Sequence, residues 1–500
     1  MHPCLLLDDI LRLVAVEIIN LERPSAVSFA CTCRAIEASV MGVLWGSYQN
    51  DLINLFRCFP SEVWEIRESD SSKLYFDFKR HPSPPEWERV NRYASWMRTL
   101  IIYEDSTCPS PSSRAWRELR ALRPADLLPN LRSLEWYSAA DTFVYINLFL
   151  SPRLTSLNVH VVPDVPNVGP ILDFFPVETL EELRFQDSSG DRAVQDAISK
   201  LVLKTTAALR SIVVSSDLSD AAIQHVTRLP NLSDASVTFA NLDRLSVSPD
   251  AGTFPLRTLE TRVDGAGGWK YLLHNVKNLD SAVLFSSTVF QPEEIVAVFG
   301  FLIDKGFHQT LRRLFFAVQN QCDLTPQVLA PLHKFESLTT LSVTSFCGPI
   351  QCKSRLTNEA LAQLAEALPQ LVKLFLGAAP CATSTGEITL AGLRPLSTHC
   401  IHLETLQIHF SAFDIPSDIP DDALSSPSDQ EPPGPNHCHL SQLVVGALPV
   451  STSENSLLIV AYFLHQLFPR LSDVVPTVPN SPWKRVQEHI NTFQKYRPKK

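Results

Sequence analysis

Residues 338–343 read LTTLSV, and the same spacing of leucines returns as LVKLFL at 371–376 and LETLQI at 403–408. Between Leu131 and Leu443 the phrase L-x-x-L-x-L recurs with its first leucines 23 to 37 residues apart. Side chains of a strand alternate between its two faces. The fourth and sixth positions of each phrase are therefore predicted to point into a core, and the residues that flank them to point out.

Weaker copies fill the gaps in this series: MRTLII at 97–102, LSDASV at 232–237, LRTLET at 256–261 and LDSAVL at 279–284. One such unit cannot bury its own apolar face, so successive units must stack and pair their strands in parallel. We therefore predict the α/β class and a leucine-rich-repeat solenoid. In this horseshoe, parallel strands line the concave face and helices line the convex face.

The segments between the phrases carry helix signals. The stretch at 356–371, LTNEALAQLAEALPQL, places apolar residues on one helical face and ends at a proline, and 218–232 repeats the design. A third version at 393–408 places Cys400 three residues before Leu403. These units resemble the longer, cysteine-containing type of leucine-rich repeat that is common in F-box proteins.

The N-terminal stretch at 5–59 is different in kind, because its apolar residues follow a helical spacing without the leucine phrase. It predicts three or four short helices. Ile10, Leu11, Val14 and Ile18 share one face, and Arg23-Pro24-Ser25 interrupts the pattern. Ser25 is expected to cap the second helix.

Asp9-Ile10-Leu11 and Cys33-Arg34 give this stretch its resemblance to the F-box. The resemblance implies that the helices dock onto a Skp-family adaptor and, through it, onto a cullin. It also implies the residues that form this contact or the small core behind it: Leu6, Ile10, Leu11, Val14, Val27 and Cys31. The alternative is a plain helical cap that shields the first repeat from water.

We predict four segments. Residues 1–60 form the F-box-like all-α module, 61–124 an irregular joining region with the first repeat, 125–478 the repeat solenoid, and 479–500 a capping helix with a basic tail. The proline-rich, acidic stretch at 414–435 lacks the residues for a core and is expected to be a surface loop. The alternative is that phosphorylation of Ser426 and Ser428 in this stretch has a regulatory role.

Composition narrows the classes of partner. The net charge is −10 and no long basic face is visible, so nucleic acid is not expected as the main partner. Apolar runs fall short of the ~20 residues that span a bilayer, and the first residues lack a secretory signal. The eleven cysteines are scattered and odd in number, which favours reduced thiols and a cytoplasmic or nuclear protein.

No catalytic motif appears in the sequence. Nucleophile elbow, P-loop and zinc-protease signatures are all missing, and His437-Cys438-His439 has no fourth ligand at a suitable spacing. We therefore expect neither an enzyme nor a cofactor nor a metal site, and assign function to a binding surface.

The outward positions of the strands define that surface. An apolar pocket is predicted where aromatic residues gather in nearby repeats, because exposed aromatic patches commonly mark binding sites. The alternative is that other elements cover these rings. The client-binding residues are predicted to be Tyr137, His160, Phe285, Phe315, Phe375 and His409. The function predicted is substrate recognition in a Skp/cullin/F-box ubiquitin ligase; the alternative is a leucine-rich-repeat scaffold without that connection.

Overall fold

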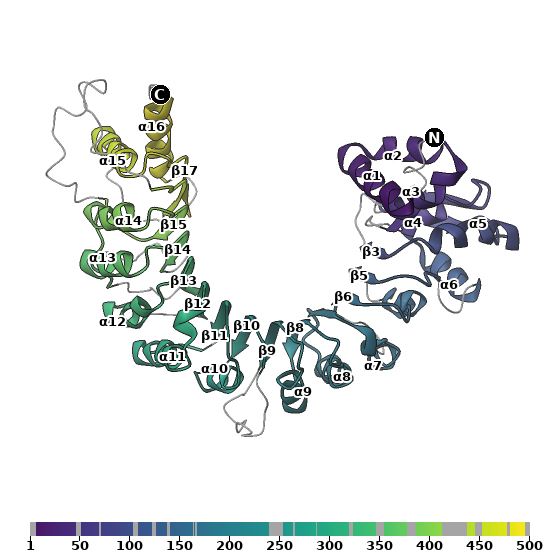
Figure 1. The fold of residues 1–500 in the computed structure, drawn as a ribbon, viewed down its shortest axis with the longest axis horizontal. Coiled ribbons are helices and arrows are strands. Elements are labelled where there is room, and N and C mark those ends of the chain that lie inside the picture. Colours follow the sequence, from purple (N-terminus) through teal and green to yellow (C-terminus); the bar gives the residue numbers. More distant parts are fainter. Residues whose placement is uncertain are drawn as a thin grey trace. The chain divides into compact units, whose positions relative to one another are not determined.

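The computed structural model describes most of the chain (Figure 1). The described residues are 7–46, 52–69, 72–103, 109–122, 127–137, 141–163, 165, 168–239, 254–263, 266–286, 288–319, 324–346, 355–377, 387–412, 438–445, 453–477 and 481–495. The chain divides into two compact units, Met1–Leu232 and Ser233–Lys500. The predicted loop at 414–435, with Ser426 and Ser428, lies outside the described residues.

Each leucine phrase forms a strand, and within each unit the strands pair in parallel. The first unit contains β3 (Thr99–Tyr103), β5 (Ser133–Tyr137), β6 (Ser156–Val161), β7 (Glu182–Asp187) and β8 (Ser211–Asp217). The second contains β9 (Asp234–Phe239), β10 (Thr258–Val263), β11 (Ser281–Ser286), β12 (Arg313–Gln319), β13 (Thr340–Phe346), β14 (Lys373–Leu376), β15 (Thr405–Ile408), β16 (Gln442–Val445) and β17 (Asp473–Pro476). The predicted parallel repeat strands are confirmed.

The leucines of successive phrases stand in register. Leu374 lies beside Leu341 on one side and Leu406 on the other, and all three are fully buried. At the start of most repeat strands, the amides of the residue before the strand and of its first residue donate to one carbonyl of the previous repeat. The N–H groups of Val372 and Lys373, for example, donate to the oxygen of Thr339 at 2.7 and 3.0 Å. The same leucine spacing thus fixes both the core and the hydrogen-bond register.

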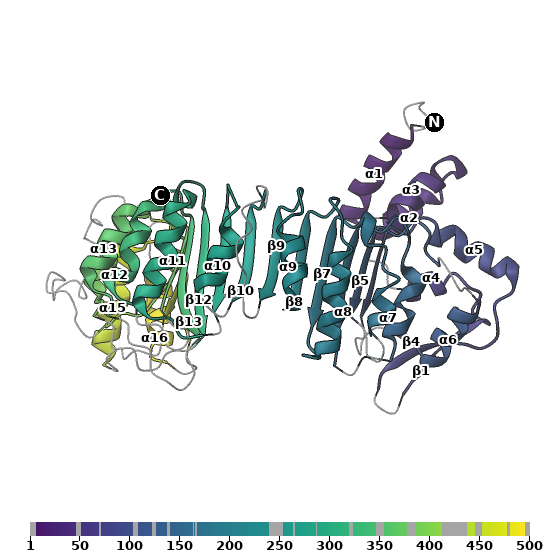
Figure 2. The same ribbon diagram turned by 90° about the horizontal axis from the view of Figure 1, so that it is seen from below.

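Helices cover one face of the strands in each unit, as Figures 1 and 2 show. They are α7 (Val168–Leu172), α8 (Arg192–Leu203) and α9 (Asp220–Val226) in the first unit and α10 (Ala266–Leu273), α11 (Pro292–Asp304), α12 (Pro326–Leu329), α13 (Asn358–Ala367), α14 (Arg394–His399) and α15 (Glu454–Leu467) in the second. A 3-10 helix, η2 (Phe143–Phe149), takes this place between β5 and β6. Further short 3-10 helices accompany an α-helix in their repeats: η3 (Val177–Thr179), η5 (Phe307–Gln309), η6 (Ala330–Lys334) and η7 (Leu390–Leu393). We call the opposite face, which carries none of these repeat helices, the open face of the sheet.

The predicted apolar stripes of these helices are confirmed. In α13 the buried residues are Ala360, Leu361, Leu364 and Ala365, and the Thr357 hydroxyl accepts a hydrogen bond from the amide of Ala360. The helix ends just before Leu368, because Pro369 disfavours helical backbone at the residue before it. Sequence therefore sets both ends of this helix.

Two cysteines join successive repeats on the helix side. The thiol of Cys400 donates to the carbonyls of Ala365 and Leu368, each at 3.5 Å, and that of Cys438 donates to the carbonyl of Cys400 at 3.5 Å. Burial, with a smaller effect of Cys438, raises the pKa of the Cys400 thiol to about 12. Both residues thus act as small buried donors, with no tendency to ionise at neutral pH.

Helices and strands make up most of the described part of 61–124, where the sequence predicted an irregular joining region. This part contains β1 (Trp64–Glu68) and β2 (Leu74–Phe78), which pair antiparallel, with α5 (Pro84–Ala94), the short β4 (Ser110–Pro111) and α6 (Ser113–Leu122). A cluster of aromatic rings holds this region on α4 (Leu52–Phe56), with centroids 4.9 to 6.3 Å apart. The rings are those of Phe56, Phe59, Phe76, Phe78 and Trp87. These aromatic residues form a local core that the leucine phrases do not predict.

The last strand of the second unit is covered by α16 (Trp483–Lys495). Trp483, Val486 and Ile490 are buried, and the Gln487 side chain accepts a hydrogen bond from the amide of Val474 in β17. An uncovered edge strand would invite pairing with other chains. The helix therefore covers the last strand of the array, at the place where a capping helix was predicted.

Candidate functional site

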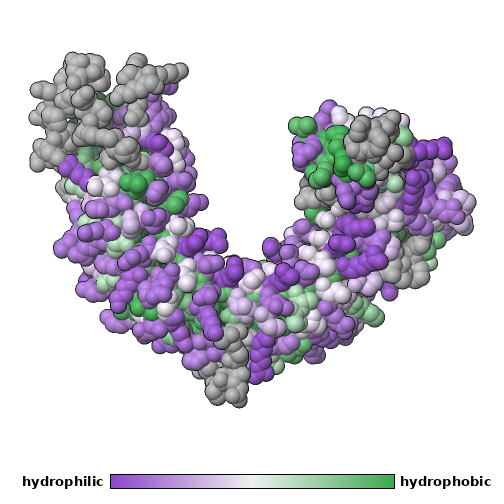
Figure 3. Space-filling model, in the orientation of Figure 1, coloured by the Kyte–Doolittle hydropathy of each residue, from purple (hydrophilic) through white to green (hydrophobic). Residues whose placement is uncertain are grey.

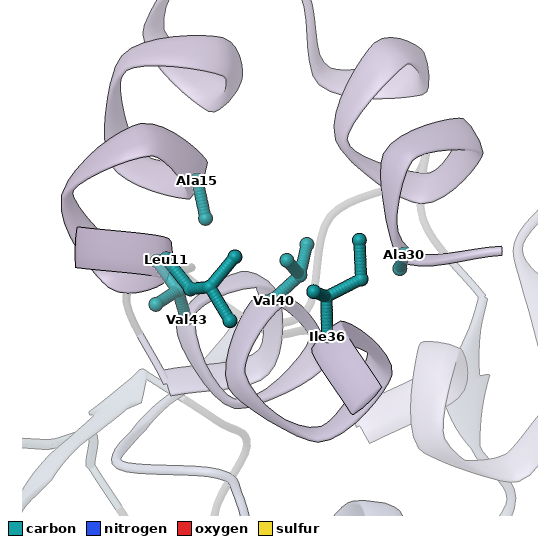
Figure 4. Close-up of a cluster of buried hydrophobic side chains, with 6 residues drawn as sticks. All are labelled: Leu11, Ala15, Ala30, Ile36, Val40 and Val43. Atoms are coloured by element: carbon teal, nitrogen blue, oxygen red, sulfur yellow. The ribbon is translucent and has the colours of Figure 1, made fainter. Parts of the chain in front are cut away.

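The first three helices form a small module with its own apolar core. These are α1 (Asp8–Leu21), α2 (Arg23–Ala30) and α3 (Arg34–Gly46), which pack on one another. Figure 4 shows the buried side chains that meet between them: Leu11, Ala15, Ala30, Ile36, Val40 and Val43. Glu22 stands at the N-cap of α2 and Ser25 lies inside that helix, so the prediction of Ser25 as its cap is wrong.

A polar contact at the start of α1 ties it to α3. The hydroxyl of Ser39 donates to one carboxylate oxygen of Asp8 at 2.5 Å, and the guanidinium of Arg12 donates to the other at 2.7 Å. These two hydrogen bonds, that of Ser39 first, lower the pKa of Asp8 below its ordinary value. A carboxylate in the first turn also suits the helix dipole, so the orientation of α1 is fixed where the module begins.

Five large apolar side chains of α1 and α2, or next to them, remain exposed. We call them the helix patch: Leu7, Leu13, Val16, Leu21 and Val27, with exposed fractions of 57, 68, 38, 86 and 43%. Figure 3 shows apolar surface gathered over these helices. The core of the module is filled without these five residues, so their exposure leaves them free to contact another protein.

The structure separates the predicted adaptor residues into core and surface. Leu11 is 1% exposed and belongs to the core, Ile10 and Val14 are half-buried, and Val27 and Cys31 are exposed. The remaining predicted residue, Leu6, lies outside the described residues.

Sequence reasoning missed the most exposed members of the helix patch. Leu13 and Val16 are three residues apart and lie on the side of α1 away from Leu11. Leu21, seven residues after Val14, instead continues the predicted stripe at the end of the helix. The apolar pair on the second side is the signal that could have identified Leu13 and Val16. A helix with apolar residues on two faces buries only one of them in the core of its module, so the other stays exposed.

The open face of the first unit carries a polar cluster around the predicted Tyr137 and His160. The Asn158 amide donates to the Tyr137 hydroxyl oxygen at 2.6 Å, and that hydroxyl donates to Glu135 at 3.2 Å. Burial, followed by the charge of Glu135, raises the pKa of Tyr137. The ring of His160 lies 6.4 Å from that of Tyr137, so the two predicted residues are neighbours here.

The open face of the second unit carries the predicted phenylalanines. Phe315 and Phe375 flank Ser342 in one row across β12, β13 and β14. Phe285 stands on β11 beside Ala317, in the next row along the strands. All three rings are half-buried.

His409 does not belong to this surface, contrary to the prediction. Its strand ends at Ile408, and the side chain is only 5% exposed. The ring packs over Gly377, where an added Cβ would lie 2.9 Å from the His409 Cδ2 atom. The prediction of an outward His409 depends on the alternation of inward and outward side chains along a strand. That alternation ends with the strand at Ile408, one residue before His409.

Two kinds of site are missing from the described residues. None of their helices is long and apolar enough to cross a membrane. In the same part of the chain, no three or more His, Cys, Asp or Glu side chains gather in a way that could hold a metal ion.

No protein-family model and no curated protein matches the sequence. Among solved structures, the chain is similar to one in the crystal structure of the Rad7 and Elc1 complex in yeast, with a TM-score of 0.36 and 14% sequence identity. The match covers 72% of this chain and 81% of that one. A similarity at this level carries no information on function.

Proposed function

We propose that this chain is the substrate-recognition subunit of a Skp/cullin/F-box ubiquitin ligase. The helix patch docks a Skp-family adaptor, and through it a cullin, while the open face of the repeats holds a client protein. The chain itself performs no chemistry; it raises the local concentration of the client at the ubiquitin-charged partner. The scattered cysteines support a location in the cytoplasm or nucleus.

The observation that carries the proposal is the exposure of the helix patch beside a core that is already filled. Apolar surface in water costs about 25 cal/mol per Å², and a cluster of such side chains commonly marks a protein-binding site. A helical cap that only shields the first repeat would bury its apolar residues against the array. Leu13 and Leu21 are 68% and 86% exposed instead.

The second supporting feature is the outward row of the repeats. The inward leucines of the repeats form the core, so the outward side chains can differ between repeats without loss of stability. The open face of the first unit carries polar groups around Tyr137, and that of the second unit carries the aromatic rings of Phe315 and Phe375. Interfaces draw much of their binding energy from such aromatic residues.

The test is binding of the full chain to a purified Skp-family adaptor. Replacing Leu13 and Leu21 together by Asp should weaken binding at least ~30-fold, since an interface hot spot contributes about 2 kcal/mol or more. Phe174→Asp is the matched control, because Phe174 is also apolar and 71% exposed but lies outside the helix patch. Leu11→Asp is unsuitable, since a buried charge there would unfold the module.

The scaffold alternative makes the opposite prediction. If the folded chain does not bind any Skp-family adaptor, or if the Leu13 and Leu21 variant binds as well as the control, the helices are a cap and the ubiquitin connection is lost. Hydrogen exchange of residues 8–46 in each variant verifies that α1–α3 remain folded.

A further inference from the structure

Three neighbouring strands of the second unit place a repeated pair of side chains on the open face. Arg313 and Phe315 lie on β12, and Lys373 and Phe375 lie on β14, each pair two residues apart on its strand. Thr340 and Ser342 stand between them on β13, in register with both pairs. We call these six residues the β12–β14 strip.

The outward side chains of the middle strand are short, so the surface there lies below the larger side chains of the two neighbouring strands. Thr340 and Ser342 are only 7% and 6% exposed although they are on the face without helices. The larger side chains on either side shield them from water. Strands lie about 4.8 Å apart, so Phe315 and Phe375 are separated by about 10 Å across Ser342. An apolar side chain of a bound segment fits over the serine, between two rings.

The cations of the strip have no acidic partner among the described residues. Arg313 and Lys373 are exposed, and neither forms an ion pair with any residue that the structure describes. Their row across the sheet continues with Ser281, Thr405 and Gln442, and its nearest carboxylates are Asp234 and Asp473. Each lies three strands from the closer cation, which is beyond contact. Asp280 and Glu404 each stand one residue before a strand of this row, and neither carboxylate pairs with Arg313 or Lys373.

We propose that the β12–β14 strip binds an acidic, extended peptide segment of the client. The segment carries a carboxylate side chain two residues from a large apolar one. This inference rests on the proposed function, since it takes the open face as the client surface. The apolar side chain lies between Phe315 and Phe375, and the carboxylate accepts hydrogen bonds from Arg313 and Lys373.

The spacing of the motif follows from strand geometry. Residues two apart on a strand point to one side and lie about 6.7 Å apart, in the sheet and in an extended peptide alike. A segment that runs along β13 therefore meets a cation and a ring at the interval of its own side chains. Hydrogen bonds between ionised groups are roughly twice as strong as neutral ones, so charge decides which segments are selected.

The experiment uses the full chain and a positional-scanning library of decapeptides. Each peptide fixes one Leu and one charged residue, Glu or Lys, at every mutual spacing, and binding is read by fluorescence polarisation. Peptides with Glu two positions from Leu should bind at least 10-fold more tightly than those with Lys there. The preference should weaken as salt is raised, because exposed charges are screened.

Charge reversal of the strip gives the decisive variant. Replacing Arg313 and Lys373 by Glu should invert the preference, so that Lys-x-Leu peptides are selected. Phe315→Ala with Phe375→Ala should abolish selection for Leu while a preference for Glu remains. Lys334→Glu, an exposed change of the same charge on the helix side in η6, should leave the library profile unchanged. The single variant Lys373→Glu, expected to weaken the preference, repeats the test if the double variant does not fold.

A profile without charge preference, or one that charge reversal does not alter, overturns the inference. Adaptor binding, measured on the same variants, separates this failure from that of the proposed function. Lost peptide selection with intact adaptor binding rejects the strip alone. Intact peptide selection without adaptor binding rejects the ubiquitin connection and leaves the strip standing.

Discussion

Gly377 shows how one residue shapes the end of the open face. It follows β14 with φ of +96°, a region that side-chain-bearing residues rarely adopt. The ring of His409 occupies the space where a Cβ would be. Glycine thus lets His409 pack against the backbone, which explains why this predicted client residue is buried.

Gly377→Ala should therefore destabilise the fold. The left-handed backbone alone costs about 1–2 kcal/mol with a Cβ, and displacement of the His409 ring adds to it. Urea unfolding of the full chain measures the loss. Gly300→Ala is the matched control: Gly300 lies inside α11 with nothing within 4 Å of an added Cβ. There the same substitution should be stabilising, by up to about 1 kcal/mol. Equal effects at both sites would contradict the explanation.

At the scale of the element, α5 illustrates a helix start that charge stabilises. Glu86 accepts hydrogen bonds from the backbone amide of Ser83 at 2.7 Å and from the guanidinium of Arg80 at 2.7 Å. These contacts, that of Arg80 first, lower the pKa of Glu86 from 4.5 to about 2. The ionised carboxylate therefore holds the beginning of α5 against the hairpin that precedes it.

The pH dependence of this contribution has a definite sign. Because the folded pKa is the lower one, the stabilisation is complete above pH 4.5 and is lost as the pH falls from there toward 2. Glu86→Gln should lower the urea midpoint at pH 6 and narrow its gap to the unchanged chain at pH 3. Glu88→Gln, exposed in the same helix, should show neither effect. An equal gap at both pH values would show that Glu86 acts without its charge.

The elements differ in how far the sequence predicts them. Leucine spacing identified the repeat strands because burial on one face demands it, as at Leu341 and Leu374. The β1–β2 hairpin follows no repeat and depends on aromatic contacts between distant residues such as Phe56 and Phe76, which are invisible locally. Helix α1 has two apolar stripes, and only packing against α3 decides that Leu11 is core and Leu13 is surface.

At the scale of the whole molecule, the boundary between the two units, at Leu232 and Ser233, falls within the repeat series and not at the end of the N-terminal helices. Each repeat of a solenoid contacts only the repeats on either side, so stability is a sum of local terms. The N-terminal helical module and the repeats that follow it share one compact unit, and the ion pair of Glu37 in α3 with Arg92 in α5, at 3.0 Å, links the module to the region before the repeats.

Because each repeat contacts only its neighbours, we expect a destabilising substitution in one repeat to affect that repeat and the two beside it. Leu157 in β6 and Leu374 in β14 are fully buried, and replacing either by Ala should cost about 2–5 kcal/mol. Hydrogen exchange followed by mass spectrometry should show Leu157→Ala raising exchange in β5, β6 and β7, and Leu374→Ala doing so in β13, β14 and β15. Lys373→Ala, exposed beside Leu374, should change stability by less than about 0.5 kcal/mol. Exchange that rises evenly along the chain for either leucine would mean that the molecule unfolds as a single cooperative body, in which a repeat responds to more than its neighbours.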